Sequence, residues 1–526
     1  MGKRIVAVFG VYVVIMLMLA GWLMKVTFSS EYVEAGAKQS SYTLTVSKSR
    51  GRIYDRNMNV IAGGAQEYRA AVEPSARSIA NLMAHYPESV HGDMEKRLRS
   101  GRPYLLDVPD GSGNGEGVTV FKIQKRYSET KSIAPHVVGY LNGEGRGVTG
   151  IERAYDNFLS GNSGEKRIRY TVDARGTSLE KEPVITDTTY RSKAGVVLTL
   201  DCETQLAVQS ALEKHVKSGA AVVMDVRSGE ILACASYPAF SQTDVAPFLD
   251  DDDSPLLNKA ISDYDVGSVF KLVVAAAAIE NGMEDFTCEC DGCEEIGGRK
   301  FYCSSKKGHG MMDMEHAIAL SCNSYFIRLG QALGGDKILQ KAREMGFGKK
   351  IALAGDYFTS GGNLPDEAEL SLPAGLANFS FGQGSLMANP VQIAAMVNCI
   401  ASGGEYVTPK IVIGTVDRYL TQKSTWKTEE KKRVMRKSTA EKLSCCMKAT
   451  FDYGTGKKLD CFASGKTGTA ETGMKKNGRK VKQAWLAGFF PADAPKYTCV
   501  VLAENGESGS ASAGPVFEEI ANALVK

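Results

Sequence analysis

Residues 264–274 read YDVGSVFKLVV, a polar turn that runs directly into an apolar stretch. Ser268 and Lys271 stand three positions apart, and the Ala-rich segment that follows ends at Gly282. This pattern predicts a buried helix with Ser268 in its first turn. Positions three apart share a helix face, so Lys271 can reach the Ser268 hydroxyl. Because a helix N-terminus and apolar surroundings both lower a lysine pKa, Lys271 is a candidate base for a Ser268 nucleophile.

The Ser-x-x-Lys pattern alone also fits an N-capping serine followed by an unrelated lysine. Two later stretches bear on this alternative. Ser321 and Asn323 flank a single residue in ALSCNSYF, next to an apolar, helix-like segment. The stretch ASGKTGTAETG carries four consecutive residues of interest: Lys466, Thr467, Gly468 and Thr469. Small residues there would let a substrate backbone lie along a strand edge. Each stretch is trivial alone, but their ordered combination is improbable by chance.

The trio Ser-x-x-Lys, Ser-x-Asn and Lys-Thr-Gly is similar to the signature set of penicillin-binding proteins and serine β-lactamases. SRGRIYDRN (residues 49–57) resembles the Arg-Gly-x-Ile-x-Asp-Arg-Asn box of class B penicillin-binding proteins. GVTGIERAYDNFLSG, FGQGSLMANPVQIA and AWLAGFFP resemble further segments of that class, so the similarity covers nearly the whole chain. Two positions depart from the family: Val266 replaces a proline, and Met58 replaces a glycine. Neither departure removes a reacting group.

The resemblance implies a catalytic role for four residues. Ser268 would be the acylated nucleophile and Lys271 its base. Ser321 would relay the proton toward the leaving amine, with help from Lys466. Neither a cofactor nor a metal is expected for this chemistry.

The resemblance also implies substrate-binding roles. Asn323 would hold the side-chain amide of the substrate, and Thr467 and Thr469, with Gly468 between them, would hold its carboxylate. The backbone N–H groups of Ser268 and Thr469 would form an oxyanion hole. Three charged residues of the N-terminal box are expected to link anchor and pedestal without taking part in chemistry: Arg50, Asp55 and Arg56.

The N-terminus predicts a membrane anchor. Ile5–Met24 is a run of twenty residues without a charge, enough for about 30 Å of helix. Lys3 and Arg4 precede the run and favour a cytoplasmic N-terminus, although Lys25 on the far side weakens the asymmetry. A cleaved signal peptide is the alternative, but the run is long and no Ala-x-Ala site closes it. We therefore expect a single-pass protein of the cell membrane with an extracytoplasmic catalytic domain.

The predicted fold class is α/β of the α+β type. AAVVMDVRSGEILACAS predicts a β-hairpin near the start of the catalytic domain, and KTGTAETG and VKQAWLAGFFP predict strands near its end, joined by a type I′ turn at Asn477-Gly478. With helices between, both ends of the domain would complete one antiparallel sheet packed with helices. The predicted parts are a cytoplasmic N-terminus (1–4), a transmembrane anchor (5–24), a connector (25–45), a non-catalytic pedestal (46–195) and a transpeptidase domain (196–526).

Twelve cysteines in an exported chain permit disulfides. Cys288, Cys290, Cys293 and Cys303 lie close together, but their spacing does not match the paired Cys-x-x-Cys knuckles of structural zinc sites. A loop disulfide that can include Cys303 is the favoured interpretation, with free thiols and zinc as alternatives. This loop is expected to be dispensable for the chemistry.

The resemblance implies a membrane-anchored serine D,D-transpeptidase that cross-links peptidoglycan stem peptides and is acylated by β-lactams. It further implies a multi-span glycan polymerase of the elongation, division or sporulation machinery as partner. A nucleic-acid partner is not expected, because 63 Lys and Arg nearly balance 60 Asp and Glu. A β-lactamase or β-lactam sensor is the first alternative, although no Glu-x-x-Leu-Asn segment lies between Ser321 and Lys466. A mainly architectural scaffold is the second.

Overall fold

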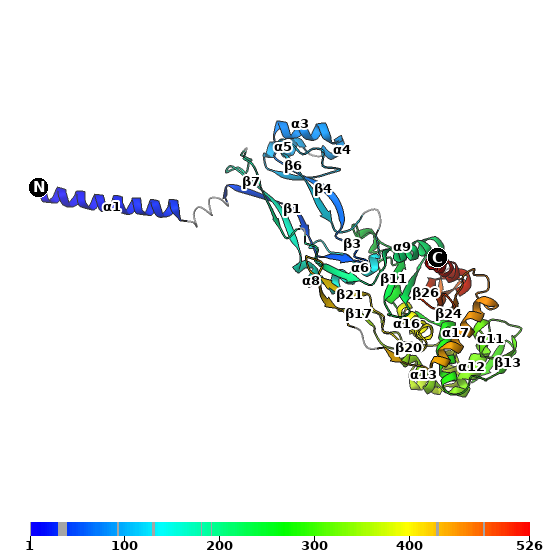
Figure 1. Cartoon of the computed structure of the whole chain (residues 1–526). Coiled ribbons are helices and arrows are strands. Elements are labelled where there is room, and N and C mark those ends of the chain that lie inside the picture. Colours follow the sequence, from blue (N-terminus) through cyan, green and yellow to red (C-terminus); the bar gives the residue numbers. More distant parts are fainter. Residues whose placement is uncertain are drawn as a thin grey trace. The chain divides into compact units, whose positions relative to one another are not determined.

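The described residues of this computed structural model form two compact units (Figure 1). The structure describes residues 2–29, 39–91, 94–128, 132–179, 181–190, 192–427, 431–476 and 479–525. The first unit contains Met1–Arg50, Gly63–Arg126 and Asn162–Ser192, and the second contains Gly51–Ala62, Tyr127–Gly161 and Lys193–Lys526. The sequence-based division at residue 195 concerns functional domains and stays a prediction.

The N-terminal helix α1 spans Gly2–Phe28, and none of its residues is buried in the protein. Its 27 residues are apolar apart from a few polar and charged side chains near the two ends, and the helix is long enough to cross a membrane. An unburied apolar helix of this length matches the predicted anchor, because water is an unfavourable environment for such a surface.

The rest of the first unit is built from two three-stranded antiparallel sheets. One contains β1 (Ser41–Ser49), β7 (Gly164–Thr171) and β8 (Val184–Thr188), and the other contains β5 (Tyr104–Val108), β4 (Ala65–Val72) and β6 (Val118–Lys125). Buried Val46, Ala71, Phe121 and Ile168 pack the two sheets together. Besides α1, the described residues of the unit form the helices α3 (Ala76–His85), α4 (Glu88–His91) and α5 (Met94–Ser100).

A five-stranded antiparallel sheet organises the second unit. Its order is β11 (Ile231–Tyr237), β10 (Gly219–Asp225), β26 (Tyr497–Glu504), β25 (Arg479–Phe490) and β24 (Ser464–Lys476). Strands from both ends of the predicted catalytic domain thus pair in one sheet, which confirms the predicted fold class. The turn predicted at Asn477-Gly478 lies outside the described residues.

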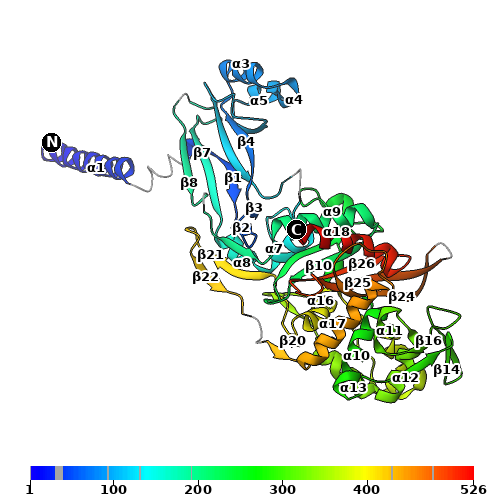
Figure 2. The ribbon, with the colours of Figure 1, turned by 45° about the vertical axis from the view of Figure 1, so that its right-hand side comes forward.

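Helices cover both faces of this sheet (Figure 2). Alternate residues of β10 face opposite sides, so Ala221 and Val223 pack in one core and Val222 and Met224 in the other. The first face carries α9 (Cys202–His215) and α18 (Gly514–Leu524). The second carries α10 (Lys271–Glu280), α16 (Pro390–Ala401) and α17 (Lys437–Asp452). Further helices extend this second core: α11 (Met314–Ala319), α12 (Asn323–Leu333), α13 (Gly335–Glu344), α14 (Glu367–Ser371) and α15 (Pro373–Ser380).

The Arg-Gly box belongs to a second, mixed sheet in the same unit. That sheet has the order β22 (Gln422–Thr425), β21 (Val412–Val416), β9 (Gly195–Leu198), β2 (Arg52–Tyr54) and β3 (Val60–Ala62). Fully buried Asp55 accepts backbone hydrogen bonds from Asn57 at 2.8 Å and Asn59 at 2.7 Å, which holds the β2–β3 turn. Arg56 pairs with Glu230 at 3.3 Å. Asp55 and Arg56 are therefore structural in this sheet.

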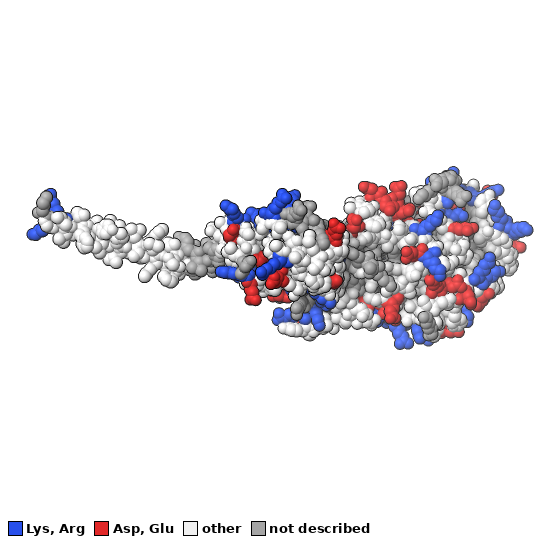
Figure 3. Space-filling model, turned by 90° about the horizontal axis from the view of Figure 1, so that it is seen from above, with Lys and Arg blue, Asp and Glu red and all other residues white. Residues whose placement is uncertain are grey.

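Charged side chains of both signs are interspersed on the face of the molecule drawn in Figure 3. The visible surface of α1 is almost free of charge away from its N-terminal end. No single-sign field covers this face, which agrees with the nearly balanced totals of 63 and 60.

Candidate active site

Ser268 lies in a 3-10 turn, Gly267–Phe270, that leads directly into α10. It is half-buried, whereas Lys271, the first residue of α10, is fully buried. The apolar residues of α10 pack on all sides in the main core, which explains why the helix begins at a lysine without a side-chain cap. The predicted helix is thus present, with Ser268 in the turn just before it.

Two glycines bring this turn against strand β24. Gly267 has a φ of +65°, and a Cβ atom there would lie 3.0 Å from the backbone carbonyl of Thr469. A Cβ atom on Gly468 would lie 3.1 Å from Val269 Cγ1 and 3.3 Å from its amide nitrogen. The Ser-x-x-Lys turn and the Lys-Thr-Gly strand therefore meet at a distance that only glycine permits comfortably.

The Lys271 amine joins the first two motifs. Its Nζ lies 2.8 Å from the backbone oxygen of Ser321, 3.3 Å from Ser321 Oγ and 2.7 Å from Asn323 Oδ1. Burial lowers the pKa of Lys271 to about 8, because a charged ammonium is poorly solvated there; nearby Cys303 and Cys322 act in the opposite direction. An amine with this pKa can serve as a base near neutral pH.

Ser321 has a left-handed backbone conformation, with φ at +57°. Such a conformation costs a non-glycine residue about 1 kcal/mol or more, and strain of this kind concentrates at functional sites. Ser321 sits between α11 and α12, and Cys322 caps α12 by accepting a hydrogen bond from the Tyr325 amide at 3.5 Å. The turn directs Ser321 toward Lys271 while Asn323 begins the helix.

The Lys-Thr-Gly-Thr residues lie in β24, paired with β25. Lys466 is fully buried, and its Nζ donates to the Thr467 carbonyl oxygen at 2.8 Å. Burial, followed by repulsion from Lys271, holds the pKa of Lys466 well below its ordinary value. The Thr467 hydroxyl lies 2.6 Å from that of Thr455. Thr469 Oγ1 accepts a hydrogen bond from the Gly509 amide at 3.3 Å.

The structure therefore brings all three predicted motifs together. Hydrogen bonds link the α10 lysine to Ser321 and Asn323, and electrostatic repulsion couples it to Lys466. Both polar atoms of the Asn323 side-chain amide have partners: Oδ1 accepts from Lys271, and Nδ2 donates to the Tyr302 carbonyl oxygen at 3.0 Å. Chemically, the site holds a serine hydroxyl and two buried amines of lowered pKa, a combination suited to nucleophilic attack and proton transfer.

Several residues support the site through contacts that the sequence analysis did not predict, although the stretches that carry them were noted there. Gly382 accepts a hydrogen bond from the Gly267 amide at 2.8 Å, and Trp485 donates its indole N–H to the Asp265 carbonyl oxygen at 2.9 Å. Cys303 Sγ accepts a hydrogen bond from the Asn323 amide at 3.2 Å. These contacts join positions far apart in the sequence, and no local pattern announces them.

Comparisons with known proteins find a matching family and relatives along most of the chain. The family described as "Penicillin binding protein transpeptidase domain" matches residues 219–522. Stage V sporulation protein D of Bacillus subtilis is 27% identical, covering 98% of this chain and 84% of that protein. Peptidoglycan D,D-transpeptidase MrdA of Acinetobacter baumannii is 25% identical, covering 98% and 87%. A chain from the structure "Structural coordination of polymerization and crosslinking by a peptidoglycan synthase complex" has a TM-score of 0.68 and 25% identity, covering 99% of both chains.

Proposed function

The chain belongs to the penicillin-binding protein transpeptidase family, and from that premise we propose that it cross-links peptidoglycan as a serine D,D-transpeptidase. The name of the Acinetobacter relative supports the reaction type. The substrates are two peptidoglycan stem peptides: one that ends in D-Ala-D-Ala and one that supplies an amine. β-Lactams acylate the same serine because they mimic the first of these substrates.

Acylation begins with the neutral amine of Lys271 accepting the proton of Ser268. The serine oxygen attacks the carbonyl carbon of the D-Ala-D-Ala bond, and the backbone N–H groups of Ser268 and Thr469 stabilise the oxyanion. Collapse of the tetrahedral intermediate breaks the peptide bond. The proton passes through Ser321, with Lys466 nearby, to the leaving amine, and D-Ala departs.

The second half-reaction reverses this sequence with a different amine. The side-chain amine of a neighbouring stem peptide attacks the acyl-Ser268 ester and loses a proton, which returns through Lys271 to the serine oxygen. A new peptide bond replaces the ester, so the reaction needs neither water nor an energy source. In the earlier acylation step, Asn323 orients the acyl donor, and Thr467 and Thr469 hold its terminal carboxylate beside Gly468 until that carboxylate leaves with D-Ala.

One observation carries this proposal: the buried Lys271 Nζ contacts both polar residues of the Ser-x-Asn motif at the base of the Ser268 turn. Labelling of the full-length protein with a fluorescent penicillin tests it. Ser268→Ala should abolish covalent labelling with little effect on folding, because neither the Ser268 turn nor α10 has a side-chain cap hydrogen bond to lose. Ser444→Ala, which removes a half-buried serine of α17, is the matched control and should label like the wild type. Undiminished labelling of folded Ser268→Ala refutes the proposal.

The membrane orientation and the partner proposed for the protein are inferred from α1 and from the relatives. Lys3 and Arg4 support a cytoplasmic N-terminus, with the residues that follow α1 outside the membrane. A solved relative from a peptidoglycan synthase complex supports a glycan-polymerising partner for this chain. The pedestal (46–195) would then mediate assembly and the domain 196–526 would carry the chemistry.

A further inference from the structure

Residues 288–312 form two nested hairpins beside the Ser-x-Asn motif. The outer pair is β13 (Cys288–Cys290) with β16 (Gly310–Met312), and the inner pair is β14 (Cys293–Ile296) with β15 (Arg299–Tyr302). Isolated two-stranded hairpins are marginally stable, and few apolar side chains of this excursion are buried. Further contacts, such as the ion pair between Glu294 and Arg328 at 3.0 Å, are therefore needed to hold it.

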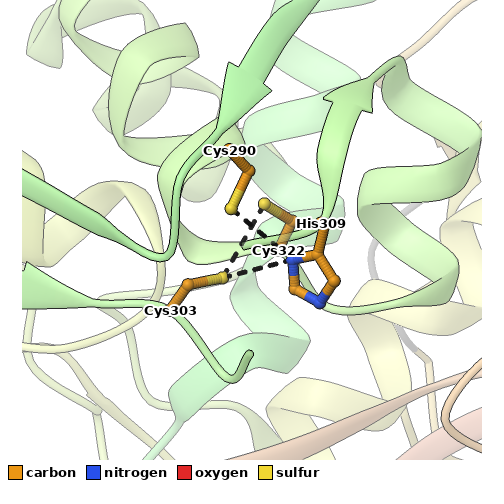
Figure 4. A group of neighbouring side chains, drawn as sticks. All are labelled: Cys290, Cys303, His309 and Cys322. Carbon is orange, nitrogen blue, oxygen red and sulfur yellow. Dashed lines mark hydrogen bonds between the residues drawn. The ribbon is translucent and has the colours of Figure 1, made fainter. Parts of the chain in front are cut away.

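Four potential metal ligands converge where the hairpins meet α12. Figure 4 shows the side chains of Cys290, Cys303, His309 and Cys322 pointing toward one another. Their sulfur and nitrogen atoms all lie within 4.8 Å of one another, and all three cysteines are buried. From this arrangement we propose that the cluster is a structural Zn²⁺ site that fixes the Ser321-Cys322-Asn323 turn.

Three of the six distances between the ligand atoms match a zinc tetrahedron. Bonds of about 2.3 Å to sulfur and 2.0–2.1 Å to nitrogen imply edges of about 3.8 Å between two sulfurs and about 3.6 Å between sulfur and nitrogen. His309 Nδ1 lies 3.6 Å from Cys290 Sγ and 3.5 Å from Cys303 Sγ. The sulfurs of Cys303 and Cys322 are 3.8 Å apart. A Cys₃His set filling all four positions is typical of structural zinc, whereas Mg²⁺ and Ca²⁺ prefer oxygen.

The backbone around the ligands is arranged to support a metal. Backbone amides donate to two of the sulfurs, from Asn323 to Cys303 at 3.2 Å and from Tyr325 to Cys322 at 3.5 Å. Such outer contacts orient ligands and offset thiolate charge. The His309 amide donates to the Cys290 carbonyl oxygen at 3.0 Å, which couples two ligands directly.

Two glycines make the close approach of the ligand loops possible. Gly292 and Gly308 have φ values of +89° and +79°. A Cβ atom on Gly308 would lie 2.1 Å from the Cys290 carbonyl oxygen, and one on Gly292 would lie 2.6 Å from that of Lys306. The loops that carry Cys290, Cys303 and His309 are thereby drawn into one tight cradle.

The structure revises the sequence-based interpretation of these cysteines. All twelve cysteines lie in the described part of the chain, and all are free thiols, so the favoured loop disulfide is not formed. Of the four clustered in sequence, Cys290 and Cys303 join the site, while Cys288 and Cys293 do not. His309 and Cys322 complete it, and Cys322 lies inside the Ser-x-Asn motif.

The position of Cys322 gives the site a positioning role in catalysis. Bound zinc would anchor this residue between Ser321 and Asn323, while Cys303 accepts the Asn323 amide hydrogen. The metal would therefore stabilise the left-handed conformation of Ser321, which costs energy on its own. This role rests on the proposed function, whereas the existence of the metal site does not.

Metal content provides the first test and requires no activity. Full-length protein purified in detergent under reducing conditions should contain one equivalent of zinc by elemental analysis. Replacing zinc with Co²⁺ should give the thiolate-to-cobalt charge transfer and the visible bands of a tetrahedral site. Cys290→Ser and His309→Ala should each lose most of the metal, while Cys288→Ser and Cys293→Ser, which alter cysteines on the same hairpins, should keep it.

Native mass spectrometry separates the possible outcomes. A mass increase corresponding to one zinc, lost in Cys290→Ser and His309→Ala but not in the controls, supports the site. Metal-free protein after purification with added zinc, or a Cys303–Cys322 disulfide that persists under those conditions, overturns it. Equal zinc content in the ligand and control variants also overturns it. Circular dichroism on every variant detects global unfolding, and a Cys290→Ala, His309→Phe double variant provides a folded, metal-free protein if the single variants unfold.

The proposed effect of zinc on the Ser321 turn is tested separately, by the rate of penicillin acylation. Removing zinc with a chelator should slow penicillin acylation of Ser268 at least tenfold, and added Zn²⁺ should restore the rate. Zinc-loaded protein that never labels, even with wild-type Ser268, contradicts the proposed function but leaves the metal site intact. Zinc removal that leaves the acylation rate unchanged overturns the positioning role.

Discussion

Lys271 Nζ lies 2.7 Å from Asn323 Oδ1, although 52 positions separate the two residues in the sequence. The lysine begins the helix that follows the Ser268 turn, and the asparagine begins α12. Because an amide oxygen only accepts hydrogen bonds, Asn323 fixes the direction of one Lys271 N–H. The second N–H group of the neutral amine can point to the Ser321 carbonyl oxygen at 2.8 Å, which leaves the lone pair free to accept a proton from a serine hydroxyl.

Removal of the proposed base should slow acylation without unfolding the protein. We expect Lys271→Met to lower the rate of penicillin acylation by two to four orders of magnitude, about the contribution of a positioned general base. Lys259→Met is a matched control, because Lys259 is also buried but its Nζ bonds to the Asp253 carbonyl oxygen at 3.1 Å, outside the three motifs. Rapid-quench mass spectrometry measures both rates. An acylation rate for Lys271→Met equal to that of the control would show that another group takes the proton.

The acylation rate should depend on pH through Lys271. Burial lowers the pKa of this amine to about 8, so the neutral, basic form is scarce below that pH. The rate should rise about tenfold per pH unit up to about pH 8 and then level off. The free energy of unfolding should also rise with pH, but at higher pH. Between about pH 8 and the ordinary lysine pKa of 10.5, the amine of Lys271 is protonated in the unfolded chain and neutral in the folded one. The buried amine therefore destabilises the fold fully below about pH 8, and this destabilisation disappears as the pH rises to 10.5. A rate that is constant from pH 6 to 9 would contradict this assignment.

The close contact between Gly468 and the Ser268 turn should be sensitive to one methyl group. Gly468→Ala places a Cβ atom 3.1 Å from Val269 Cγ1, so the turn must shift away from β24. We expect a loss of about 1–3 kcal/mol in unfolding free energy and at least a tenfold slower acylation, because the oxyanion donors separate. Gly161→Ala is the control, since no atom lies within 4 Å of the added Cβ. Thermal unfolding and labelling kinetics of both variants test the contact, and wild-type kinetics in Gly468→Ala would argue against it.

The acyl-enzyme formed with penicillin should persist. A transpeptidase and a β-lactamase acylate the serine alike, and they differ in whether a base then activates water. A missing general base costs two to four orders of magnitude in hydrolysis rate, and each order corresponds to about 1.4 kcal/mol. Intact-protein mass spectrometry after a penicillin pulse should show the Ser268 adduct for many minutes. Rapid return to the unmodified mass, with repeated turnover, would indicate a hydrolase.

The hairpin loop shows how far local sequence patterns can mislead. Cysteine spacing within residues 288–303 excluded the common zinc knuckles, and that reasoning was sound for ligands close together in sequence. The cluster instead takes ligands from two hairpins and a helix cap, with Cys322 nineteen positions from Cys303. Ligands brought together by tertiary packing leave no regular spacing, so the pattern of the loop alone could not reveal the site.

The sequence by itself determined the apolar N-terminal run, the terminal strands of the central sheet and the three motifs proposed to be catalytic. Each of these depends on local features: an uncharged run, apolar runs on either side of a turn, or a helix start with a serine and a lysine on one face. Only the tertiary structure decided the left-handed Ser321, the burial that lowers the Lys271 pKa, the contact of Gly468 with the Ser268 turn, and the grouping of His309 with three cysteines. The physical reason is the same in each case, because burial, electrostatic coupling and ligand geometry depend on distances between residues that lie far apart in the chain.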